Sequence, residues 1–399
     1  MKNILIVIHR LEVGGGAERI ATEVGNVLDD KGYNVIFLTF VKKENEYEVE
    51  TKRIVYNKYD NLIVGIDPFN PKIIVRAKKI ADICEKYKIN TVISFLYKTN
   101  ITSILSKTIF NNKSKINCSV RNNPMLNFGK FEKYLIKKLY PKADKVVALS
   151  EGVEIELKEN FSLDNTCYIH NVQNVGKFKR MAEKKILENH KEIFDDSFNF
   201  ITIGSLSKQK GQWYLLRCFK KVSQSRRDAK LIVLGEGSLR RNLEELVKKM
   251  DLEEKVFFLG NVENVFPYLK KSDCFVLSSL WEGFGNVLTE ALSQDIPVIS
   301  TDCTAGPREI LCPELGIREE INYPYYGKYG ILVESFDNQM FLKTLEEKPL
   351  SEDEKIFANS MIKIMDDQKL RNRYSDCSER VEDFKASRII QQWEELFKK

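Results

Sequence analysis

The sequence predicts an α/β protein with two domains, each built around a parallel sheet. The chain has 399 residues, which is longer than a single hydrophobic core usually grows, so two domains are expected. Short apolar runs alternate with helix-like segments along both halves, the pattern of strands joined by crossover helices. Hydrophobic residues make up 43% of the chain and charged residues 30%, as in a folded globular protein.

The first half opens with the apolar run ILIVIH, a glycine turn and the segment AERIATEVGNVLDDKGYNVIFLTF. An apolar run, a helix of period near 3.6 and a second apolar run together indicate a β-α-β unit. Two later runs, TVISFLY and KVVALS, repeat this order. We therefore expect a first Rossmann-like domain over residues 1–172.

Polar sequence with little strand signal follows, and we place an interdomain linker at residues 173–197. The alternation restarts with FNFITIGSL and continues through AKLIVLGEG, KVFFLGNV, CFVLSS and IPVISTD. This regular order predicts a second Rossmann-like domain over residues 198–378. The tail, residues 379–399, is expected to be a helix whose apolar face consists of Ile389, Ile390, Trp393 and Phe397.

Composition argues against several classes of protein. Eight cysteines are scattered without a C-x-x-C pair and the chain has only three histidines, so a zinc site is not expected. No apolar run approaches the roughly 18 residues that a membrane span needs. The start MKNILIVIHR is too short for a signal peptide and lacks a cleavage site, so it is interpreted as the first strand.

Positive charge is concentrated in residues 71–145, which contain 17 Lys and Arg against 4 Asp and Glu, although the whole chain carries only +6. There, FGKFEKYLIKKLYPKADK places apolar residues at 128, 131, 135 and 139 beside lysines. Such a stripe is typical of a helix on an anionic membrane surface. The alternative is an ordinary amphipathic helix with a solvated basic face. Nucleic-acid binding is not expected, because no nucleic-acid-binding motif accompanies the charge.

A glycine-rich loop follows an apolar run in each half. EVGGGAER, residues 12–19, opens a helix, where backbone N–H groups and the helix dipole can receive an anion. It lacks G-x-G-x-x-G spacing and a P-loop lysine, so a tight turn without a ligand is the alternative. GSLSKQKG, residues 204–211, places Lys208 and Lys210 near a helix start. A lysine there can neutralise a departing diphosphate, whereas two solvated lysines in a turn are the alternative.

The stretch WEGFGNVLTEAL follows the run CFVLSS and carries Glu282 and Glu290. A helix that starts near Asn286, after two glycines, would point the amides of Asn286, Val287 and Leu288 at an anion. Glu290 would lie about one turn further, roughly 6 Å along the axis, a separation suited to a carboxylate that binds ribose hydroxyls. The two glutamates would therefore bracket a phosphate site. For Glu290, a helix-dipole role is the alternative.

Together these segments resemble family 4 of the retaining glycosyltransferases, which are nucleotide-sugar-dependent enzymes of the GT-B fold. The resemblance covers nearly the whole chain, because VGGGAER, ADKVVALSEGV, IHNVQNV, GSLSKQKG, LIVLGEGSLRRNLE, VFFLGNVENV and the glutamate pair occur in the family's order. It implies two Rossmann-like domains that face a cleft, the first for the acceptor and the second for the nucleotide sugar. It also implies a C-terminal helix that crosses back to the first domain.

Residue by residue, the resemblance implies that Gly15 and Gly16 approach the donor diphosphate and sugar, and that Lys210 binds the diphosphate. Glu282 matches the glutamate that contacts the sugar hydroxyls, and Glu290 the one that holds the ribose. The remaining implied donor contacts are those of Val262 with the base and of the amides of Asn286, Val287 and Leu288 with the phosphates.

Two positions depart from the family pattern. Ser205 stands where many members have an arginine that shares the diphosphate with the lysine. Either Lys208 substitutes for that arginine at a different register, or the site uses a single cation. Arg121, in NCSVRNNP, stands where many members have a histidine near the reacting carbon. Arginine stays protonated, so Arg121 cannot act as a base, but it can stabilise a phosphate or a bound acceptor. His9 and His170 remain candidates for an imidazole near the cleft.

The resemblance implies a retaining transferase that moves a hexose or N-acetylhexosamine from a nucleotide sugar, expected to be UDP-linked, to a polyprenyl-diphosphate-linked oligosaccharide. The pathways expected are capsule, exopolysaccharide or O-antigen synthesis. No D-x-D motif occurs, so neither a metal nor another cofactor is expected. The protein is expected in the cytoplasm, attached to the inner face of the membrane through residues 71–145. A nucleotide-sugar 2-epimerase and a non-catalytic GT-B partner subunit stay open as alternatives.

Overall fold

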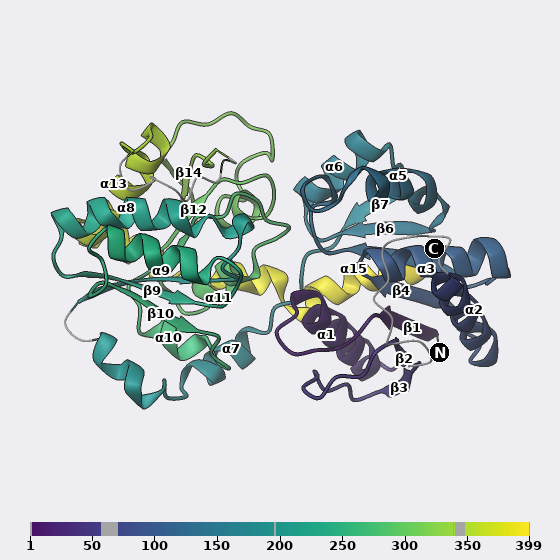
Figure 1. The fold of residues 1–399 in the computed structure, drawn as a ribbon. Coiled ribbons are helices and arrows are strands. Elements are labelled where there is room, and N and C mark those ends of the chain that lie inside the picture. Colours follow the sequence, from purple (N-terminus) through teal and green to yellow (C-terminus); the bar gives the residue numbers. More distant parts are fainter. Residues whose placement is uncertain (1, 57–70, 195–196, 338, 340–347, 399) are drawn as a thin grey trace. The chain divides into compact units, whose positions relative to one another are not determined.

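The computed structural model describes residues 2–56, 71–194, 197–337, 339 and 348–398. The chain folds into two compact units (Figure 1): a first unit of residues 1–172 and 386–399, and a second unit of residues 173–385. Each unit is built on a sheet of largely parallel strands with helices packed against it. The predicted α/β class with two Rossmann-like domains is therefore confirmed.

The sheet of the first unit is parallel throughout its described strands, in the order β3-β2-β1-β4-β5-β6-β7. Its interior strand β1 is buried along Ile4 to Ile8, because parallel sheets are covered on both faces. The strands are β1 (Asn3–Ile8), β2 (Asn34–Thr39), β3 (Lys52–Val55), β4 (Thr91–Phe95), β5 (Lys115–Val120), β6 (Lys145–Ala148) and β7 (Thr166–Tyr168).

Helices connect these strands, as the alternating sequence predicts. They are α1 (Gly16–Asp30), α2 (Pro71–Lys86), α3 (Tyr97–Phe110), α4 (Pro124–Asn127), α5 (Lys130–Leu139) and α6 (Glu151–Phe161), with a short 3-10 helix η1 (Tyr140–Lys142).

The last helix of the chain, α15 (Ala386–Lys398), belongs to the first unit. Its four predicted apolar residues are buried in the core that β1 and α1 also form. The Lys31 ammonium lies 2.7 Å from the carboxylate of Glu394 and ties the helix to the end of α1. Residues 379–385 do not extend this helix. They lie in the second unit, where Phe384 packs edge-on against Phe284.

The basic stretch after residue 128 forms α5, but its apolar residues do not make one stripe. Leu135 and Ile136 are buried against the first unit, whereas Phe131 is 47% exposed and Tyr134 is 56% exposed. The predicted stripe at 128, 131, 135 and 139 is therefore divided between the packed side of the helix and its solvent side.

The sheet of the second unit has the order β10-β9-β8-β11-β12-β14-β13, and only β13 runs antiparallel to its neighbour among the described strands. The strands are β8 (Phe198–Ile203), β9 (Ala229–Leu234), β10 (Val256–Gly260), β11 (Cys274–Leu277), β12 (Val298–Thr301), β13 (Tyr325–Tyr326) and β14 (Ile331–Val333).

The helices of the second unit are α7 (Val175–Ala182), α8 (Gln212–Ser225), α9 (Arg240–Lys249), α10 (Phe266–Lys270), α11 (Asn286–Leu292), α12 (Pro307–Leu311), α13 (Glu352–Asp366) and α14 (Gln368–Tyr374). The described residues of this unit also form the 3-10 helices η2 (Glu188–Phe194), η3 (Lys208–Lys210) and η5 (Ser378–Phe384). Residues 173–197, which we predicted as a linker, include α7, and the ring of Phe178 stacks 4.6 Å from that of Phe266 in α10. This segment therefore packs within the second unit.

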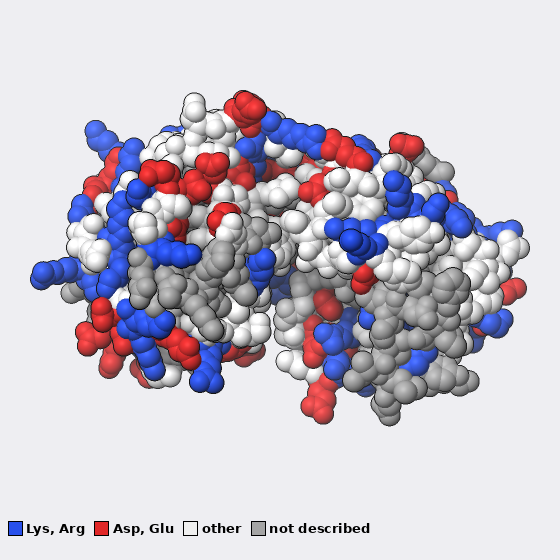
Figure 2. All heavy atoms as spheres, turned by 45° about the horizontal axis from the view of Figure 1, so that its top comes forward, with Lys and Arg blue, Asp and Glu red and all other residues white. Residues whose placement is uncertain are grey.

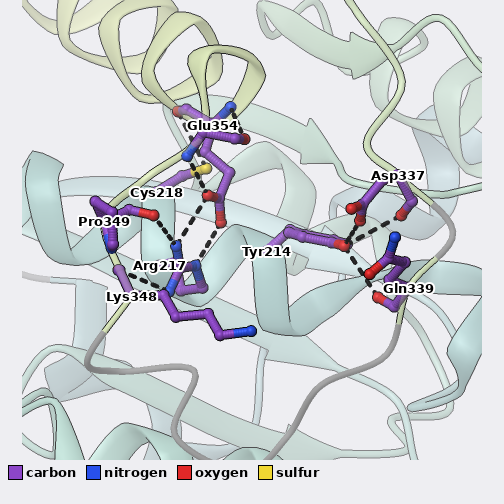
Figure 3. A network of polar contacts seen from close by, with 9 residues as sticks. Tyr214, Arg217, Cys218, Asp337, Gln339, Lys348, Pro349 and Glu354 are labelled. Atoms are coloured by element: carbon purple, nitrogen blue, oxygen red, sulfur yellow. Dashed lines mark hydrogen bonds and ion pairs between the residues drawn. The ribbon is translucent and has the colours of Figure 1, made fainter.

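A buried ion pair joins α8 to α13 (Figure 3). The Arg217 guanidinium binds the Glu354 carboxylate, with Nη2 3.0 Å from Oε2, and both side chains are less than 5% exposed. Arg217 also donates to the carbonyl oxygens of Lys348 and Pro349 just before α13. The pair thus fixes where the chain enters this helix. Because both charges are shielded from water, the loss of one partner would leave the other unpaired.

Candidate active site

In the second unit, the strand order places two predicted motifs side by side. The chain builds β8, β9 and β10 toward one edge and then crosses back to place β11 and β12 on the other side of β8. Ligands of open α/β sheets bind at such a switch point, at the carboxyl ends of the strands. The loop that carries Lys210 follows β8, and the loop that carries Glu282 follows β11. The two loops therefore flank the switch point.

At this point the structure brings Lys210 and Glu282 into direct contact. The lysine Nζ lies 2.5 Å from Glu282 Oε1, and the two side chains are 14% and 7% exposed. Ser279 Oγ donates to the same carboxylate oxygen at 2.7 Å. A partly desolvated cation beside a partly desolvated carboxylate provides one group for phosphate and one for hydroxyls.

Backbone contact between neighbouring loops holds this pair in place. Gly211 has a left-handed backbone (φ +57°), and a Cβ there would lie 2.4 Å from the carbonyl oxygen of Ser278. Gly306, in the loop after β12, has φ +93°, and a Cβ there would lie 1.9 Å from the carbonyl oxygen of Phe284. Hence the loops after β8, β11 and β12 touch through positions where only glycine fits.

Polar contacts reinforce the same arrangement. The amide of Leu280 donates to the carbonyl oxygen of Gln209 at 2.8 Å, and Gln209 Nε2 donates to the carbonyl oxygen of Trp281 at 3.0 Å. Ser278 Oγ donates to the carbonyl oxygen of Lys210 at 2.9 Å. Three hydrogen bonds thus join the loop that carries Lys210 to the loop that carries Glu282 next to the ion pair.

Helix α11 begins at Asn286, as predicted, after Gly285 in the left-handed region. The amide of Leu288 donates to the carbonyl oxygen of Gly285 at 2.9 Å, so an anion would have to share this amide with the turn. Asn286 accepts a bond from Gln173 Nε2 at 3.0 Å through its side-chain oxygen. Of the three amides that we expected to face a phosphate, Leu288 is therefore already engaged, whereas Val287 lies partly exposed in the first turn.

The other predicted donor contacts of the second unit lie along the same edge. Glu290 is in α11 and is 5% exposed. Val262 is partly exposed just after β10, at the far end of the edge. Ser205 is exposed, and its hydroxyl lies 3.0 Å from that of Ser207. Lys208, our candidate substitute for the missing arginine, is exposed in η3, whereas Lys210 turns inward to Glu282.

In the first unit, the glycine loop is closer to a carboxylate than we expected. Gly15 is the residue before α1, and a Cβ there would lie 2.1 Å from Oε2 of Glu18. Glu18 is 8% exposed, and its other oxygen is 4.0 Å from Arg10 Nε. A diphosphate beside Gly15 and Gly16 would therefore meet a negative charge unless Glu18 moved or was neutralised.

Arg121 lies at the carboxyl end of β5 in the first unit. Its Nε donates to Ser119 Oγ at 2.5 Å and its Nη1 to Asn171 Oδ1 at 2.7 Å. The guanidinium also lies over the rings of Phe95 and Trp393, 5.4 and 5.9 Å from their centres. Burial lowers the pKa of this guanidinium to about 9, because no acidic group compensates the lost hydration.

The three histidines have different surroundings. Burial, followed by the charges of Arg76, Arg10, Lys98 and Lys43, lowers the pKa of His9 to about 4. His9 is therefore neutral near pH 7 and follows β1 in the first unit. His170 packs against the ring of Tyr168 at 5.2 Å, and His190 Nδ1 lies 2.9 Å from the Tyr268 hydroxyl.

The described residues contain neither a metal-binding cluster nor a membrane-spanning helix. No group of three or more His, Cys, Asp or Glu side chains in the described ranges is placed to hold a metal ion. Within those ranges, no helix is both long enough and apolar enough to cross a bilayer.

One further part of the carboxyl edge of the second sheet, the loop after β12, was not predicted from the sequence. Arg308 of α12 binds the Asp302 carboxylate and donates to the carbonyl oxygen of Glu319 at 2.6 Å. The Tyr323 hydroxyl donates to Asp302 Oδ2 at 2.7 Å. These bonds pin the tyrosine-rich segment after α12 to the loop that carries Gly306. The sequence feature that could have indicated this loop is the glycine in TDCTAGP, which follows the strand run IPVIST.

Comparisons with known proteins identify relatives of this arrangement. Residues 14–174 match the family described as Glycosyltransferase Family 4, and residues 183–347 match Glycosyl transferases group 1. An uncharacterized glycosyltransferase of Methanocaldococcus jannaschii is 41% identical over 379 residues, which are 92% of this chain and 93% of that protein.

A second relative has a named activity. The N-acetylgalactosamine-N,N'-diacetylbacillosaminyl-diphospho-undecaprenol 4-alpha-N-acetylgalactosaminyltransferase of Campylobacter jejuni is 30% identical over 93% of this chain and 97% of its own length. Among solved structures, Anabaena HepE in complex with UDP superposes with a TM-score of 0.73 at 15% identity, over 100% of both chains.

Proposed function

The chain belongs to the glycosyl transferases of group 1 and family 4, and we propose that it is a retaining enzyme that uses a UDP-sugar. The sugar it transfers is a hexose or an N-acetylhexosamine, and its acceptor is an oligosaccharide on a polyprenyl diphosphate. The enzyme acts in capsule, exopolysaccharide or O-antigen synthesis. The observation that carries this proposal is the contact between Lys210 and Glu282 at the switch point of the second unit.

The chemistry of this pair matches the needs of sugar transfer. Breaking the bond between the sugar and a nucleoside diphosphate leaves negative charge on the phosphate oxygens, which a fixed cation stabilises. Lys210 supplies that cation, while Glu282 accepts hydrogen bonds from sugar hydroxyls. Glu290 in α11 holds the ribose. The acceptor hydroxyl attacks from the face that the diphosphate leaves, and its proton passes to the departing phosphate. No protein nucleophile is then needed.

The donor and the acceptor are supported by named relatives. HepE was solved with UDP, and the Campylobacter relative is named for an acceptor on diphospho-undecaprenol. The first unit offers Arg121, a cation at the carboxyl edge of its sheet, for the acceptor.

The test is a donor screen with the purified protein and undecaprenyl-diphosphate-linked acceptors, followed by mass spectrometry. We expect one UDP-sugar to add one residue to the acceptor, with loss of product in Lys210→Ala. Lys248→Ala, on the exposed end of α9, is the matched control and should leave transfer unchanged. Turnover of a UDP-sugar without acceptor would favour an epimerase, and absence of UDP binding would favour a non-catalytic subunit.

We also propose that α5 attaches the enzyme to an anionic membrane. Phe131 and Tyr134 are exposed on this helix, and Lys130, Lys137 and Lys138 are exposed beside them. Figure 2 shows Lys and Arg side chains next to uncharged ones over the surface of the first unit. Apolar rings flanked by lysines suit the boundary between lipid headgroups and acyl chains.

Flotation with vesicles tests this attachment. Vesicles with phosphatidylglycerol should carry the protein upward, and binding should weaken several-fold in 0.5 M salt because the lysine contribution is screened. Phe131→Ser with Tyr134→Ser should weaken it further, while Ile109→Ser, an exposed apolar residue on α3, serves as the control. Equal binding to neutral and anionic vesicles would contradict the proposal.

A further inference from the structure

The first unit has a switch point of its own. Its strands β1, β2 and β3 extend toward one edge, and the chain then crosses back to place β4 and β5 on the other side of β1. The carboxyl ends of β1 and β4 therefore flank the position where an open α/β sheet accepts ligands. His9 and Arg10 follow β1, whereas Tyr97 and Lys98 begin α3 directly after β4.

Cations from four separate elements gather around this position. The amides of Phe40 and Val41 donate to the carbonyl oxygen of His9, both at 3.0 Å, so the loop after β2 lies against the end of β1. The Arg76 guanidinium of α2 lies 4.7 Å over the Phe40 ring, whose centre is 6.5 Å from that of His9. Arg76 thus reaches the same end of the sheet from a third element. Lys98 stands at the start of the fourth, α3.

The lowered pKa of His9 reflects its burial first and then the positive charges around it. After burial, the largest causes that lower its pKa are the charges of Arg76, Arg10, Lys98 and Lys43. Burial and these cations both disfavour a proton on His9, so the imidazole stays neutral near pH 7.

The nearby carboxylates are already paired with other groups. Glu12 lies 2.9 Å from Arg10, Glu18 lies 4.0 Å from it, and Glu46 lies 2.6 Å from Arg53. In the described part of the chain, neither Lys43 nor Lys98 has a carboxylate within ion-pair distance. Positive charge at the switch point of the first unit therefore exceeds negative charge.

Beyond the carboxyl ends of the neighbouring strands β4 and β5, buried hydrogen-bonding groups also lack partners. Arg121 Nη2, Asn123 Nδ2 and the Tyr97 hydroxyl are buried without a hydrogen-bond partner among the described residues. Asn123 is only 1% exposed and Tyr97 only 6%. Glu132, the one carboxylate whose charge raises the pKa of Tyr97, acts more weakly than burial does. Buried donors are normally satisfied, so these three groups are available to bond an acceptor-rich ligand.

We propose that this edge of the first unit binds the diphosphate of the lipid-linked acceptor, with Lys98, Lys43 and Arg76 as its cations and Arg121 and Asn123 as adjoining donors. The inference rests on the proposed function, because it names how the acceptor of that reaction is held. A diphosphate fits because it is a compact anion with only acceptor oxygens, and the start of α3 adds a favourable dipole. The donor diphosphate has its own cation, Lys210, in the second unit.

A binding experiment separates these two anion sites. Inorganic diphosphate is titrated into the full-length protein already saturated with UDP, and heat release is recorded. We expect binding that weakens roughly tenfold in Lys98→Gln, since one charge-assisted contact is lost. Lys43→Gln should act in the same direction, and the Lys98→Gln/Lys43→Gln variant should bind more weakly than either. Lys113→Gln, exposed before β5 at the opposite end of the sheet, should behave as wild type.

Kinetics then identify the source of the diphosphate. Acceptor KM for a prenyl-diphosphate-linked sugar should rise roughly tenfold in Lys98→Gln, whereas donor KM should stay within twofold. For the same sugar on a neutral alkyl chain, Lys98→Gln should behave as wild type. Arg121→Lys, which keeps the charge, should retain more acceptor affinity than Arg121→Gln, and both variants should be checked for an unchanged melting temperature.

The outcomes distinguish this inference from the proposed function. If wild type binds UDP and transfers sugar but Lys98→Gln and Lys43→Gln leave diphosphate binding and acceptor KM unchanged, the subsite is wrong and the transferase stands. If diphosphate binding disappears in Lys210→Ala but persists in Lys98→Gln, the anion belongs to the second unit. If wild type neither binds UDP nor transfers sugar, the proposed function itself fails.

Discussion

The two units share the order of the first five strands of their sheets but differ in the charge at their switch points. In the second unit, Lys210 and Glu282 form a balanced pair, 2.5 Å apart, held by loops in backbone contact. In the first unit, Lys43 and Lys98 have no carboxylate within ion-pair distance among the described residues, and Arg76 adds positive charge near His9, which its surroundings keep neutral. The same fold can therefore present two kinds of site, depending on the residues that follow the strands at the switch point. The residues after β8 and β11 make a mixed site suited to phosphate and hydroxyls, whereas those after β1 and β4 make a cationic site suited to an anion.

The balanced pair should produce the largest loss when it is broken. We expect Lys210→Ala to lower kcat roughly 100- to 1,000-fold, because a fixed group that stabilises the leaving charge is removed. Glu282→Gln should lower kcat by a similar factor. The loss of kcat in the double variant should be far smaller than the product of the two single losses, because each single change already breaks the same ion pair. Purely additive losses, measured under saturating donor, would contradict a functional pair.

The loop contact that positions this pair should be the next most sensitive feature. Gly306→Ala would place a Cβ 1.9 Å from the carbonyl oxygen of Phe284 and push the turn that carries Glu282. Displacement of about 1 Å can reduce turnover about 100-fold, so kcat should fall strongly. Gly316→Ala is the control, because a Cβ there meets nothing closer than 3.8 Å. Unchanged kcat in a folded Gly306→Ala protein would show that the loop tolerates this shift.

A smaller effect is expected further along α11. Glu290→Gln should raise donor KM roughly tenfold while kcat stays within about twofold, because the ribose contact that we propose for this carboxylate would be made in both the ground state and the transition state. The measurement is a comparison of kcat and donor KM between Glu290→Gln and Glu282→Gln by initial-rate kinetics. If both variants changed turnover and affinity equally and negligibly, the assignment of the two glutamates would be wrong.

The cationic site of the first unit should show a weaker, pH-dependent signature. The folded pKa of His9 is about 4, below its usual 6.5, so the unfolded chain binds more protons between these values. Its contribution to stability is fully present above pH 6.5 and is lost as pH falls toward 4, by up to about 3 kcal/mol. Denaturant unfolding at several pH values should therefore show a shallower decline in His9→Gln than in wild type.

The same histidine reports on the proposed anion. Bound diphosphate would offset the cations around His9, so its pKa should move upward, toward 6.5, in a proton NMR titration. His190, which contacts Tyr268 in the second unit, is the internal control, and its ring signals should not respond to diphosphate. A His9 pKa that ignores diphosphate would argue that the anion binds elsewhere.

Much of the fold was predictable from local pattern alone. Strand runs such as ILIVIH and CFVLSS became β1 and β11, and α11 begins at Asn286 as the glycines before it indicated. These features depend on period, apolar content and turn residues, which act over a few neighbouring positions. The predicted start of the C-terminal helix was less accurate. Residues 379–385 belong to the second unit, where Phe384 packs against Phe284, a residue far away in the sequence.

The sequence by itself determined the fold class, the family resemblance and the residue types that can serve sugar transfer, because motifs and periodicity are local properties. Only the tertiary structure decided that Lys210 and Glu282, 72 positions apart, form an ion pair, and that Glu18 lies over Gly15. It also decided that cations from β1, β2, α2 and α3 converge around His9. Strand order and loop contact set these proximities, and neither is written in any single segment of the chain.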